Sequence, residues 1–262
     1  MTKELITTVR SGITRLALFK DRVQVGSGSG FLFNNLIITN SHVIRRSPFD
    51  SIEITFGDQA SNPITPIRYA SDTLFRAIVA ESSENEFDYA ILKIDEPELA
   101  DRYRFSLKKI EDEIVGEQVL FFGFPFSSQH LTSHIGYISA DYFDDEVHIF
   151  QIDGSINPGN SGGPLVKITS GEAIGIVTRT QTGLEKDFDA LIQAINNNVQ
   201  PLEQSRVGAR MSIGGIDPIE ATQVTMTILG KLSINLKRSA NVGIGYAFSI
   251  EHILETGLFN RT

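Results

Sequence analysis

A serine inside a glycine-rich turn is the first feature of this sequence that could do chemistry. Ser161 lies in the stretch I-D-G-S-I-N-P-G-N-S-G-G-P-L-V at residues 152–166. Gly159, Gly162 and Gly163 leave room for the backbone to approach whatever the serine contacts. Backbone N–H groups in such a turn are free to point toward a developing negative charge. The stretch therefore predicts a nucleophilic serine beside an oxyanion hole, the donors that hold the charged oxygen of a tetrahedral intermediate.

A serine hydroxyl is a weak nucleophile at neutral pH, so it needs a general base and a group that orients that base. Histidine suits the base role because its unperturbed pKa lies near 6.5. His42 follows a strand-like run, and Asp88 stands at the head of the strand-like run Tyr89–Ile94. We expect Asp88 to orient His42, and His42 to serve Ser161. The other histidines lack such flanks and are expected to be surface or structural residues: His130, His134, His148 and His252.

Three blocks of the sequence resemble the signature blocks of trypsin-like serine proteases of the bacterial HtrA/Deg group. They are G-S-G-S-G-F-L-F…I-I-T-N-S-H-V-I, D-Y-A-I-L-K-I-D and N-P-G-N-S-G-G-P-L-V. Shorter similar blocks occur at 121–126, 132–140 and 242–250. The resemblance covers most of residues 12–180 and returns at 241–255. It implies a serine endopeptidase that hydrolyses protein substrates without a cofactor or a metal ion. In a departure from typical chains of this group, no PDZ-like domain is expected after the last strand, because only about ten residues follow it.

The resemblance also implies a substrate site. The oxyanion hole is expected at Gly159, Asn160 and Ser161, with the N–H groups of Gly159 and Ser161 as donors. Residues that bind the substrate are expected just before the serine, after the strand that follows it, and on the last strand: Ser155, Ile156, Thr178, Arg179, Thr180 and Ile244. No acid is among the residues expected to line the specificity pocket. We therefore expect cleavage after small or apolar residues rather than after Arg or Lys.

Two other functions compete with the protease. G-N-S-G-G at 159–163 also matches G-x-S-x-G, the nucleophile elbow of α/β-hydrolases. That elbow needs a helix directly after the serine, which Gly162, Gly163 and Pro164 oppose, and a histidine later in the chain, where only His252 is found. An α/β-hydrolase-type esterase is therefore one alternative. The other is a catalytically silent binding module with a protease fold.

The elements that must position these residues are mostly short strands. Strand-like runs separated by turn signals occupy 13–38 with a turn at Asn34-Asn35, 52–56, 64–69, 75–80 and 89–94, then 117–122, 134–139, 147–152, 164–168, 173–179 and 244–250. No helix is expected before residue 100, and the charged stretch 95–112 has the composition of a linker. With the resemblance, this pattern implies an all-β fold of two six-stranded antiparallel barrels. Residues 1–105 would carry His42 and Asp88, and residues 106–262 would carry Ser161.

Residues 181–240 depart from the resembling pattern, which has a short loop there. Apolar residues at i, i+3, i+4 and i+7 predict a short helix near 187–198, ended by Pro201: they are Phe188, Leu191, Ile192 and Ile195. Residues 222–236 alternate like strands. We expect an insertion packed on the barrel, with a docking element for a partner protein as the alternative.

Composition excludes several function classes. The formal net charge is −9, which argues against nucleic acid or an anionic membrane surface as the main partner. The chain has no cysteine, so disulfides and thiolate metal sites are excluded. No apolar run approaches the ~18 residues of a membrane span, and the N-terminus lacks the apolar core of a signal peptide. A cytoplasmic protein is expected if the sequence is complete.

Overall fold

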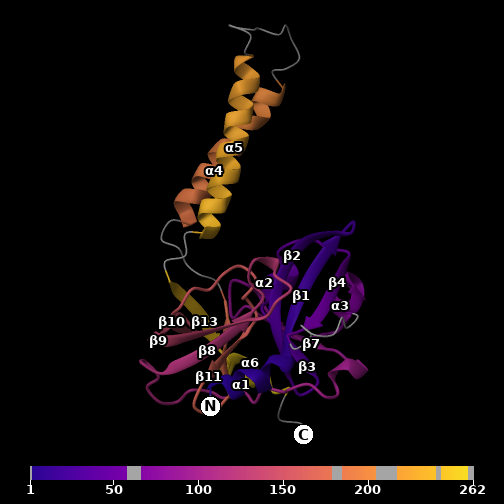
Figure 1. Ribbon diagram of the computed structural model, residues 1–262, viewed down its shortest axis with the longest axis vertical. Helices are drawn as coiled ribbons and strands as arrows, with labels where there is room; N and C mark the ends of the chain where they lie inside the picture. The colour runs from indigo at the N-terminus through magenta and orange to yellow at the C-terminus, as the bar shows by residue number, and fades with distance from the viewer. Residues whose placement is uncertain (1, 58–65, 179–184, 205–216, 240–242, 259–262) are drawn as a thin grey trace. The chain divides into compact units, whose positions relative to one another are not determined.

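The chain folds into two compact units. The computed structural model describes residues 2–57, 66–178, 185–204, 217–239 and 243–258. One unit comprises residues 1–180 and 243–262, and the other comprises residues 181–242. The larger unit contains a seven-stranded sheet and a closed six-stranded barrel (Figure 1). The expected all-β class is confirmed, although the first sheet has one strand more than expected.

The first sheet is antiparallel, with the strand order β5-β4-β1-β2-β3-β7-β6. Its strands are β1 (Ile13–Lys20), β2 (Val23–Phe33), β3 (Leu36–Thr39), β4 (Ser51–Phe56), β5 (Ile67–Ala70), β6 (Ile78–Ser82) and β7 (Tyr89–Lys93). The predicted turn between β2 and β3 is present, and Asn34 adopts a positive φ of 51° there. Asparagine tolerates this left-handed conformation better than most residues.

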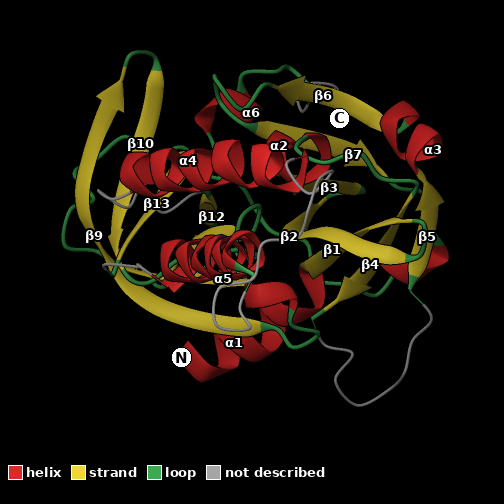
Figure 2. Ribbon diagram, turned by 90° about the horizontal axis from the view of Figure 1, so that it is seen from above, coloured by secondary structure: helices red, strands yellow, loops and turns green. Residues whose placement is uncertain are grey.

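The second sheet closes on itself in the order β10-β13-β12-β11-β8-β9. Its strands are β8 (Gln118–Gly123), β9 (Thr132–Asp144), β10 (Val147–Asp153), β11 (Pro164–Lys167), β12 (Ala173–Val177) and β13 (Ile244–Ser249). All six lie where the sequence pattern predicts strands. Closure leaves no free sheet edge. Strands β9 and β10 run side by side to a tight turn (Figure 2).

A shared apolar cluster joins the two sheets. We call it the seam, and its fully buried members include Phe31, Ile38, Ile91, Leu120, Phe122, Val166 and Ile176. Each buried Phe or Ile contributes roughly 1.5–3 kcal/mol, more than the ~1 kcal/mol of a typical hydrogen bond, so apolar burial dominates this interface. Both sheets belong to one compact unit. The expected division into domains of residues 1–105 and 106–262 therefore stays a prediction.

The expectation of no helix before residue 100 is wrong. Short helices occur at α1 (Thr2–Val9), α2 (Ser41–Arg45) and α3 (Ser71–Arg76), and α6 (Glu251–Leu254) follows the last strand. Helices α2 and α3 are too short to show a periodic apolar pattern, so no helix signal marks them in the sequence. Because α3 occupies residues 71–76, β6 begins at Ile78 rather than at residue 75.

The stretch 95–112 is packed on the body of the protein rather than extended as a linker. It contains a 3-10 turn at Pro97–Leu99 and a bridge from Leu107 to Ala173 of β12. Phe105 is 2% exposed and packs edge-on against Phe31, with ring centroids 5.5 Å apart. Its backbone N–H also donates to the carbonyl of Leu32. The charged composition of this stretch indicated an exposed linker, although Phe105 is buried.

The smaller unit is a helical hairpin of α4 (Glu185–Gln204) and α5 (Pro218–Ser239). The helix expected at 187–198 is confirmed but longer, and it continues through Pro201. The strand expected at 222–236 is wrong, because these residues belong to α5. Threonines produce the alternation there, and inside the helix the hydroxyls of Thr225 and Thr227 donate to carbonyls four residues earlier.

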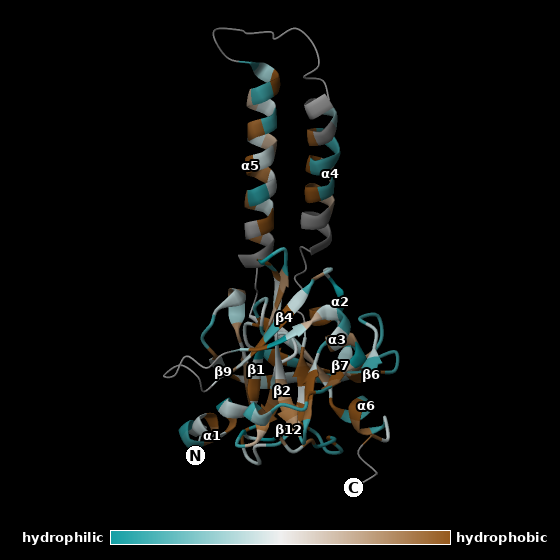
Figure 3. Cartoon of the chain, turned by 90° about the vertical axis from the view of Figure 1, so that its right-hand side faces the viewer, coloured by the Kyte–Doolittle hydropathy of each residue, from teal (hydrophilic) through white to brown (hydrophobic). Residues whose placement is uncertain are grey.

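The two faces of α5 differ. Gln223, Met226, Gly230 and Ser233, spaced as on one helix face, are less exposed than the residues between them. Apolar side chains on the outward face are about half exposed: Val224, Ile228, Leu229, Leu232 and Leu236. Figure 3 shows apolar residues along the length of this helix. Among the described residues, none of the helices combines the length and the apolar character needed to cross a membrane.

Candidate active site

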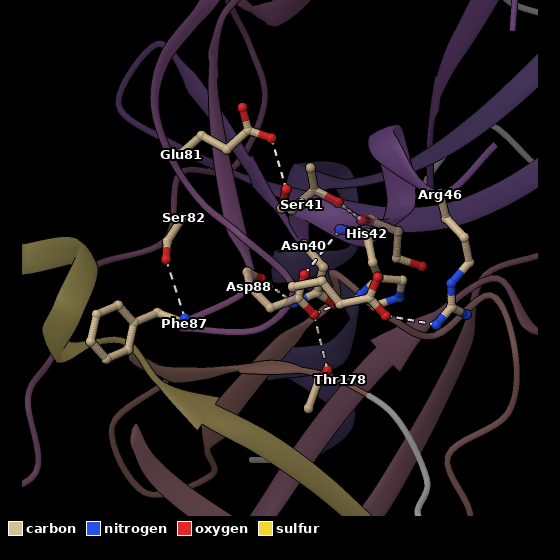
Figure 4. Close-up of polar contacts among 12 residues, drawn as sticks. Asn40, Ser41, His42, Arg46, Glu81, Ser82, Phe87, Asp88 and Thr178 are labelled. Carbon is tan, nitrogen blue, oxygen red and sulfur yellow. Dashed lines mark hydrogen bonds and ion pairs between the residues drawn. The ribbon is translucent and has the colours of Figure 1, made fainter. Parts of the chain in front are cut away.

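His42 and Asp88 meet because the strands before and after them pair. Strand β3 pairs with β7, so that Thr39 lies opposite Ala90. His42 follows β3 in α2, and Asp88 immediately precedes β7. His42 Nδ1 lies 2.6 Å from Asp88 Oδ2, and the His42 backbone N–H donates to Asp88 Oδ1 over 2.9 Å (Figure 4). Both residues are buried, at 7% and 0% exposure. One carboxylate thus fixes both the ring and the backbone of the histidine.

Asp88 is itself held from several directions. It adopts a positive φ of 47°, an uncommon conformation that Asp tolerates and that is enriched at functional sites. Its N–H donates to Ser83 O, and its carbonyl accepts from Asn40 Nδ2 over 2.8 Å. From the second sheet, Thr178 Oγ1 lies 3.4 Å from Asp88 Oδ2. Contacts from Ser83, Asn40 and Thr178 thus hold Asp88 in this uncommon backbone conformation.

Helix α2 is clamped to β6 by Glu81. The hydroxyl of Ser41 donates to Glu81 Oε1 over 2.7 Å, and Arg45 donates to both carboxylate oxygens, over 2.9 and 2.7 Å. The hydrogen bond from Arg45 lowers the pKa of Glu81, and partial burial opposes this change. These contacts flank His42 on both sides in sequence, so they restrict movement of the helix that carries it.

The turn that carries Ser161 joins β10 to β11, and its peptide groups are anchored one by one. We call residues 157–163 the oxyanion loop. Inside it, Asn160 N–H donates to Asn157 O over 2.9 Å, and Gly163 N–H donates to Asn160 O over 3.0 Å. Gly162 N–H donates to Val177 O of β12 over 2.8 Å. The loop is therefore tied to its own barrel.

The oxyanion loop also contacts the first sheet. Ser29 of β2 donates its N–H to Ser161 O over 2.8 Å. Gly162 lies so close to the first sheet that an added Cβ would be 2.1 Å from Ser29 O and 2.4 Å from Thr39 Oγ1. Thr39 ends the strand that leads to His42. The structure therefore brings the backbone of the serine turn against the strand that leads to His42.

Two N–H groups of the oxyanion loop, those of Gly159 and Ser161, make no hydrogen bond within the described part of the chain. Gly159 has a φ of 104°, which a residue with a side chain rarely adopts. These are the donors that the sequence assigns to the oxyanion hole. Asn160 between them is fully buried, and its side-chain amide has no partner among the described residues.

The hydroxyl of Ser161 makes no hydrogen bond to His42 in the described residues. Hydrogen bonds between nucleophile and base are often long before substrate binds and shorten in the complex. The arrangement can do acyl-transfer chemistry. A buried carboxylate orients an imidazole, and the loop that carries the serine offers the N–H groups of Gly159 and Ser161 to an oxyanion.

The expected substrate-binding residues are only partly brought together. Ser155 is exposed, whereas Ile156 is 3% exposed and packs on β13, where a Cβ added at Gly245 would meet Ile156 Cδ1 at 2.3 Å. Ile244 pairs with Asp153 next to this contact. Thr178 contacts Asp88 with its side chain and donates its N–H to Tyr246 O. Arg179 and Thr180 lie outside the described residues.

Sequence reasoning missed two residues that organise the site, Ser29 and Asn40. The motif G-S-G-S-G indicated a close approach of backbones, which Gly28 confirms, since a Cβ there would lie 2.5 Å from Val43. Nothing in the motif indicated a contact to the serine turn. Asn40 stands two residues before His42, in the block that carries the resemblance, but its bond to Asp88 becomes visible only after folding.

The other histidines are surface or structural residues, as expected. His130 is exposed. His148 is buried between Asp141 and Glu251, 2.5 and 3.0 Å from its two ring nitrogens. His134 and His252 stack on the rings of Phe121 and Phe87.

Comparisons with known proteins bear on the family of this chain. Residues 28–176 match the family model of the trypsin-like peptidase domain. The chain is 35% identical to Protease Do-like 1, chloroplastic, of Arabidopsis thaliana over 63% of this chain and 37% of that protein. It is 34% identical to serine protease HTRA4 of Homo sapiens over 59% of this chain and 30% of that protein. A probable periplasmic serine endoprotease, DegP-like, of Rickettsia prowazekii is 28% identical over 86% of this chain and 43% of the relative.

The chain spans less than half the length of these curated relatives. Among solved structures, HtrA-type protease AlgW with tripeptide has a TM-score of 0.58 and 22% identity, covering 97% of this chain and 62% of that one. At this identity the likeness concerns the fold. The family model, in contrast, matches more than half of the sequence, including His42, Asp88 and Ser161. The chain belongs to the trypsin-like peptidase family.

Proposed function

We propose that this chain is a serine endopeptidase that hydrolyses peptide bonds of protein substrates through His42, Asp88 and Ser161. The observation that carries the proposal is the buried carboxylate of Asp88, which holds His42 by two hydrogen bonds beside the oxyanion loop. A silent binding module would not need this fixed imidazole. An esterase of the α/β-hydrolase type would need a helix directly after the serine, whereas β11 begins at Pro164.

The reaction follows from the geometry. Ser161 Oγ attacks the carbonyl carbon of the scissile bond and forms a C–O bond, while its proton passes to His42 Nε2. The N–H groups of Gly159 and Ser161 hold the resulting oxyanion. When the C–N bond breaks, His42 gives the proton to the leaving amine. Water then attacks the acyl ester in the same way, which releases the carboxylic acid and restores the Ser161 hydroxyl. Asp88 stabilises the imidazolium throughout.

Specificity for small or apolar residues before the scissile bond is part of the proposal. Ile156 supports it, because its buried side chain lies over Gly245 and presents hydrocarbon next to Ile244. Neither Ser155 nor Ile244 brings a negative charge to this wall. A peptide library should therefore be cleaved mainly after small or apolar residues. A profile dominated by Arg or Lys would refute this assignment.

The test of the function compares the wild-type chain with Ser161→Ala. We expect the wild type to be labelled by a fluorophosphonate probe and to cleave peptides from the library, and the variant to do neither. The control is Ser139→Ala, which removes an exposed serine hydroxyl of β9. Peptide cleavage that survives in Ser161→Ala would contradict the proposed nucleophile. Ester turnover that depends on His252 would favour the esterase instead.

Two further expectations stay predictions. The first is that a partner protein docks on residues 181–240, for which the half-exposed apolar face of α5 is the supporting feature. The second is a cytoplasmic location. The names of two relatives place those proteins in the chloroplast and the periplasm, so location within this family varies.

A further inference from the structure

Ser29 of the first sheet contacts the oxyanion loop with both its side chain and its backbone. It lies in β2 opposite Arg15 of β1 and is fully buried. Its hydroxyl donates to Gly159 O over 2.6 Å, and its backbone N–H donates to Ser161 O over 2.8 Å. One residue thus holds the carbonyl groups of both residues whose N–H groups would bind the oxyanion.

The side chain of Ser29 is also held in place. Its oxygen accepts the N–H of Phe124 over 3.1 Å, and its backbone carbonyl accepts the hydroxyl of Thr39 over 2.7 Å. A serine hydroxyl has one proton, and here that proton is committed to Gly159 O. The bond crosses from the seven-stranded sheet to a loop of the closed barrel, so it couples the two halves of the site.

The orientation of the peptide groups explains why these bonds matter. The C=O and N–H of one peptide point in opposite directions, so a rotated peptide exchanges a donor for an acceptor. The neighbouring carbonyls are also anchored, because Pro158 O accepts the N–H of Phe126 over 2.7 Å and Asn160 O accepts that of Gly163. The peptide after Gly159 lies between the two peptides that carry the donor N–H groups. Its carbonyl is held by Ser29 over 2.6 Å, with a longer 3.4 Å contact from Phe124 N–H, and its N–H, that of Asn160, donates to Asn157 O over 2.9 Å.

Gly159 has no side chain that would restrict the backbone of the loop at this position. Glycine populates positive and negative φ about equally, so its φ of 104° is not secured by sterics. A strong, buried hydrogen bond to its carbonyl replaces the missing steric restraint. We propose that Ser29 is a positioning residue, whose hydroxyl keeps the oxyanion loop in the conformation with the Gly159 and Ser161 N–H groups directed at the substrate. This inference rests on the proposed peptidase function.

Ser29→Ala tests the inference, because it removes the bond to Gly159 O, together with the one from Phe124 N–H, and leaves the backbone bond to Ser161 intact. We expect kcat to fall by roughly 10- to 100-fold, since an oxyanion donor displaced by about 1 Å costs on that order. KM should change by less than about twofold, because ground-state binding does not use the oxyanion hole. The control is Ser27→Ala, two residues earlier on β2, whose hydroxyl lies 3.0 Å from Ser127 Oγ and does not contact the oxyanion loop in the described part of the chain.

A second readout separates positioning from simple loss of stability. A peptide aldehyde with the sequence of the best library substrate adds Ser161 Oγ, and its oxygen then occupies the oxyanion hole. Its inhibition constant should rise by the same factor as kcat falls, whereas the constant for the matching peptide amide stays unchanged. Each rate is expressed per folded molecule, from urea unfolding of the same sample. Ser29→Cys keeps a weaker donor of similar size, and its kcat should lie between those of the wild type and Ser29→Ala.

Three results would overturn the inference. They are equal kcat per folded molecule in Ser29→Ala and wild type, a loss confined to KM, and an aldehyde constant that does not move with kcat. If Ser29→Ala does not fold, the Ser29→Cys comparison decides in the same way. A wild-type chain that neither cleaves peptides nor reacts with fluorophosphonate would instead overturn the proposed function, so the two failures are distinguishable.

Discussion

At the scale of single residues, Asp88 is the residue on which the site depends most. Its carboxylate contacts the ring and backbone of His42 and the hydroxyl of Thr178, and its backbone is fixed by Ser83 and Asn40. Such a carboxylate selects the tautomer of the imidazole with Nε2 free to accept a proton. The positive φ of Asp88 shows that the fold accepts local strain to hold this geometry.

Asp88→Asn should lower kcat by about 10⁴-fold, because an amide favours the wrong histidine tautomer while preserving the shape of the site. Far-UV circular dichroism should stay unchanged. The measurement is peptide hydrolysis at saturating substrate, with Asp95→Asn as the control at an exposed position of similar sequence context. An Asp88→Asn variant that keeps a tenth or more of the activity would contradict the proposed role.

His134 predicts a pH dependence of stability. Burial against Phe121 lowers the pKa of His134, so the folded state favours the neutral ring. Below the ordinary pKa of about 6.5 the unfolded chain binds a proton that the folded chain refuses, and the free energy of unfolding therefore decreases as pH falls. Burial also lowers the pKa of His252, against the charges of Glu251 and Glu255, and this adds to the same trend.

Replacing His134 by Phe should reduce this dependence, because Phe keeps the stacked ring and removes the proton site. Urea unfolding is measured between about pH 5 and pH 8 in a Ser161→Ala background, which prevents self-digestion. The slope of the free energy of unfolding against pH should become shallower but not vanish, since His252 remains. An unchanged slope would show that His134 does not titrate as its burial indicates.

At the scale of elements, the hairpin of α4 and α5 has a glycine where the two helices meet. Gly230 faces α4, where a Cβ would lie 3.5 Å from Ile195 Cγ2, an ordinary van der Waals distance. The inward face of α5 is otherwise polar or flexible, with Gln223, Met226 and Ser233. On α5, the larger aliphatic side chains named above are instead about half exposed.

Gly230→Ala should stabilise the hairpin by about 1 kcal/mol, because alanine has the higher helix propensity and its methyl fits the available space. The same substitution at Gly116 provides the contrast: its φ is 89°, so alanine is strained there and should destabilise. Both variants are compared by urea unfolding followed through helical circular dichroism. Destabilisation by Gly230→Ala would mean that the helices approach more closely than the structure shows.

At the scale of the whole molecule, the two sheets belong to one compact unit and residues 181–242 form another. The strands on either side of the hairpin are neighbours, since Val177 of β12 pairs with Ala247 of β13 and Thr178 N–H donates to Tyr246 O over 2.9 Å. Paired antiparallel strands lie about 5 Å apart, so a short loop can join them.

Replacing residues 181–242 by a Gly-Ser linker of about four residues should therefore leave the larger unit folded. Its urea midpoint, followed by tyrosine fluorescence, should match that of the full chain. The control is a linker of the same composition and of about twelve residues, which tests whether closure of the loop matters. Collapse of both shortened chains would show that the larger unit needs the hairpin for folding.

The strand pattern was predictable because alternation and turn residues are local properties of the sequence. Eleven predicted runs cover all the strands of the two sheets, and the turn at Asn34 was located directly. Local pattern failed where local preference and tertiary context disagree. Threonines between apolar residues imitate a strand in α5, and helices such as α2 are shorter than the period that would reveal them.

The sequence by itself determined the residue types of the site, their order along the chain and the family, because these depend on blocks of contiguous residues. Tertiary structure decided which groups touch. Ser29 and Ser161 lie far apart in the sequence, and only the packing of the two sheets through the seam, which includes Phe31 and Phe122, brings them within a hydrogen bond. A long-range contact of this kind depends on the whole fold, so no local motif encodes it.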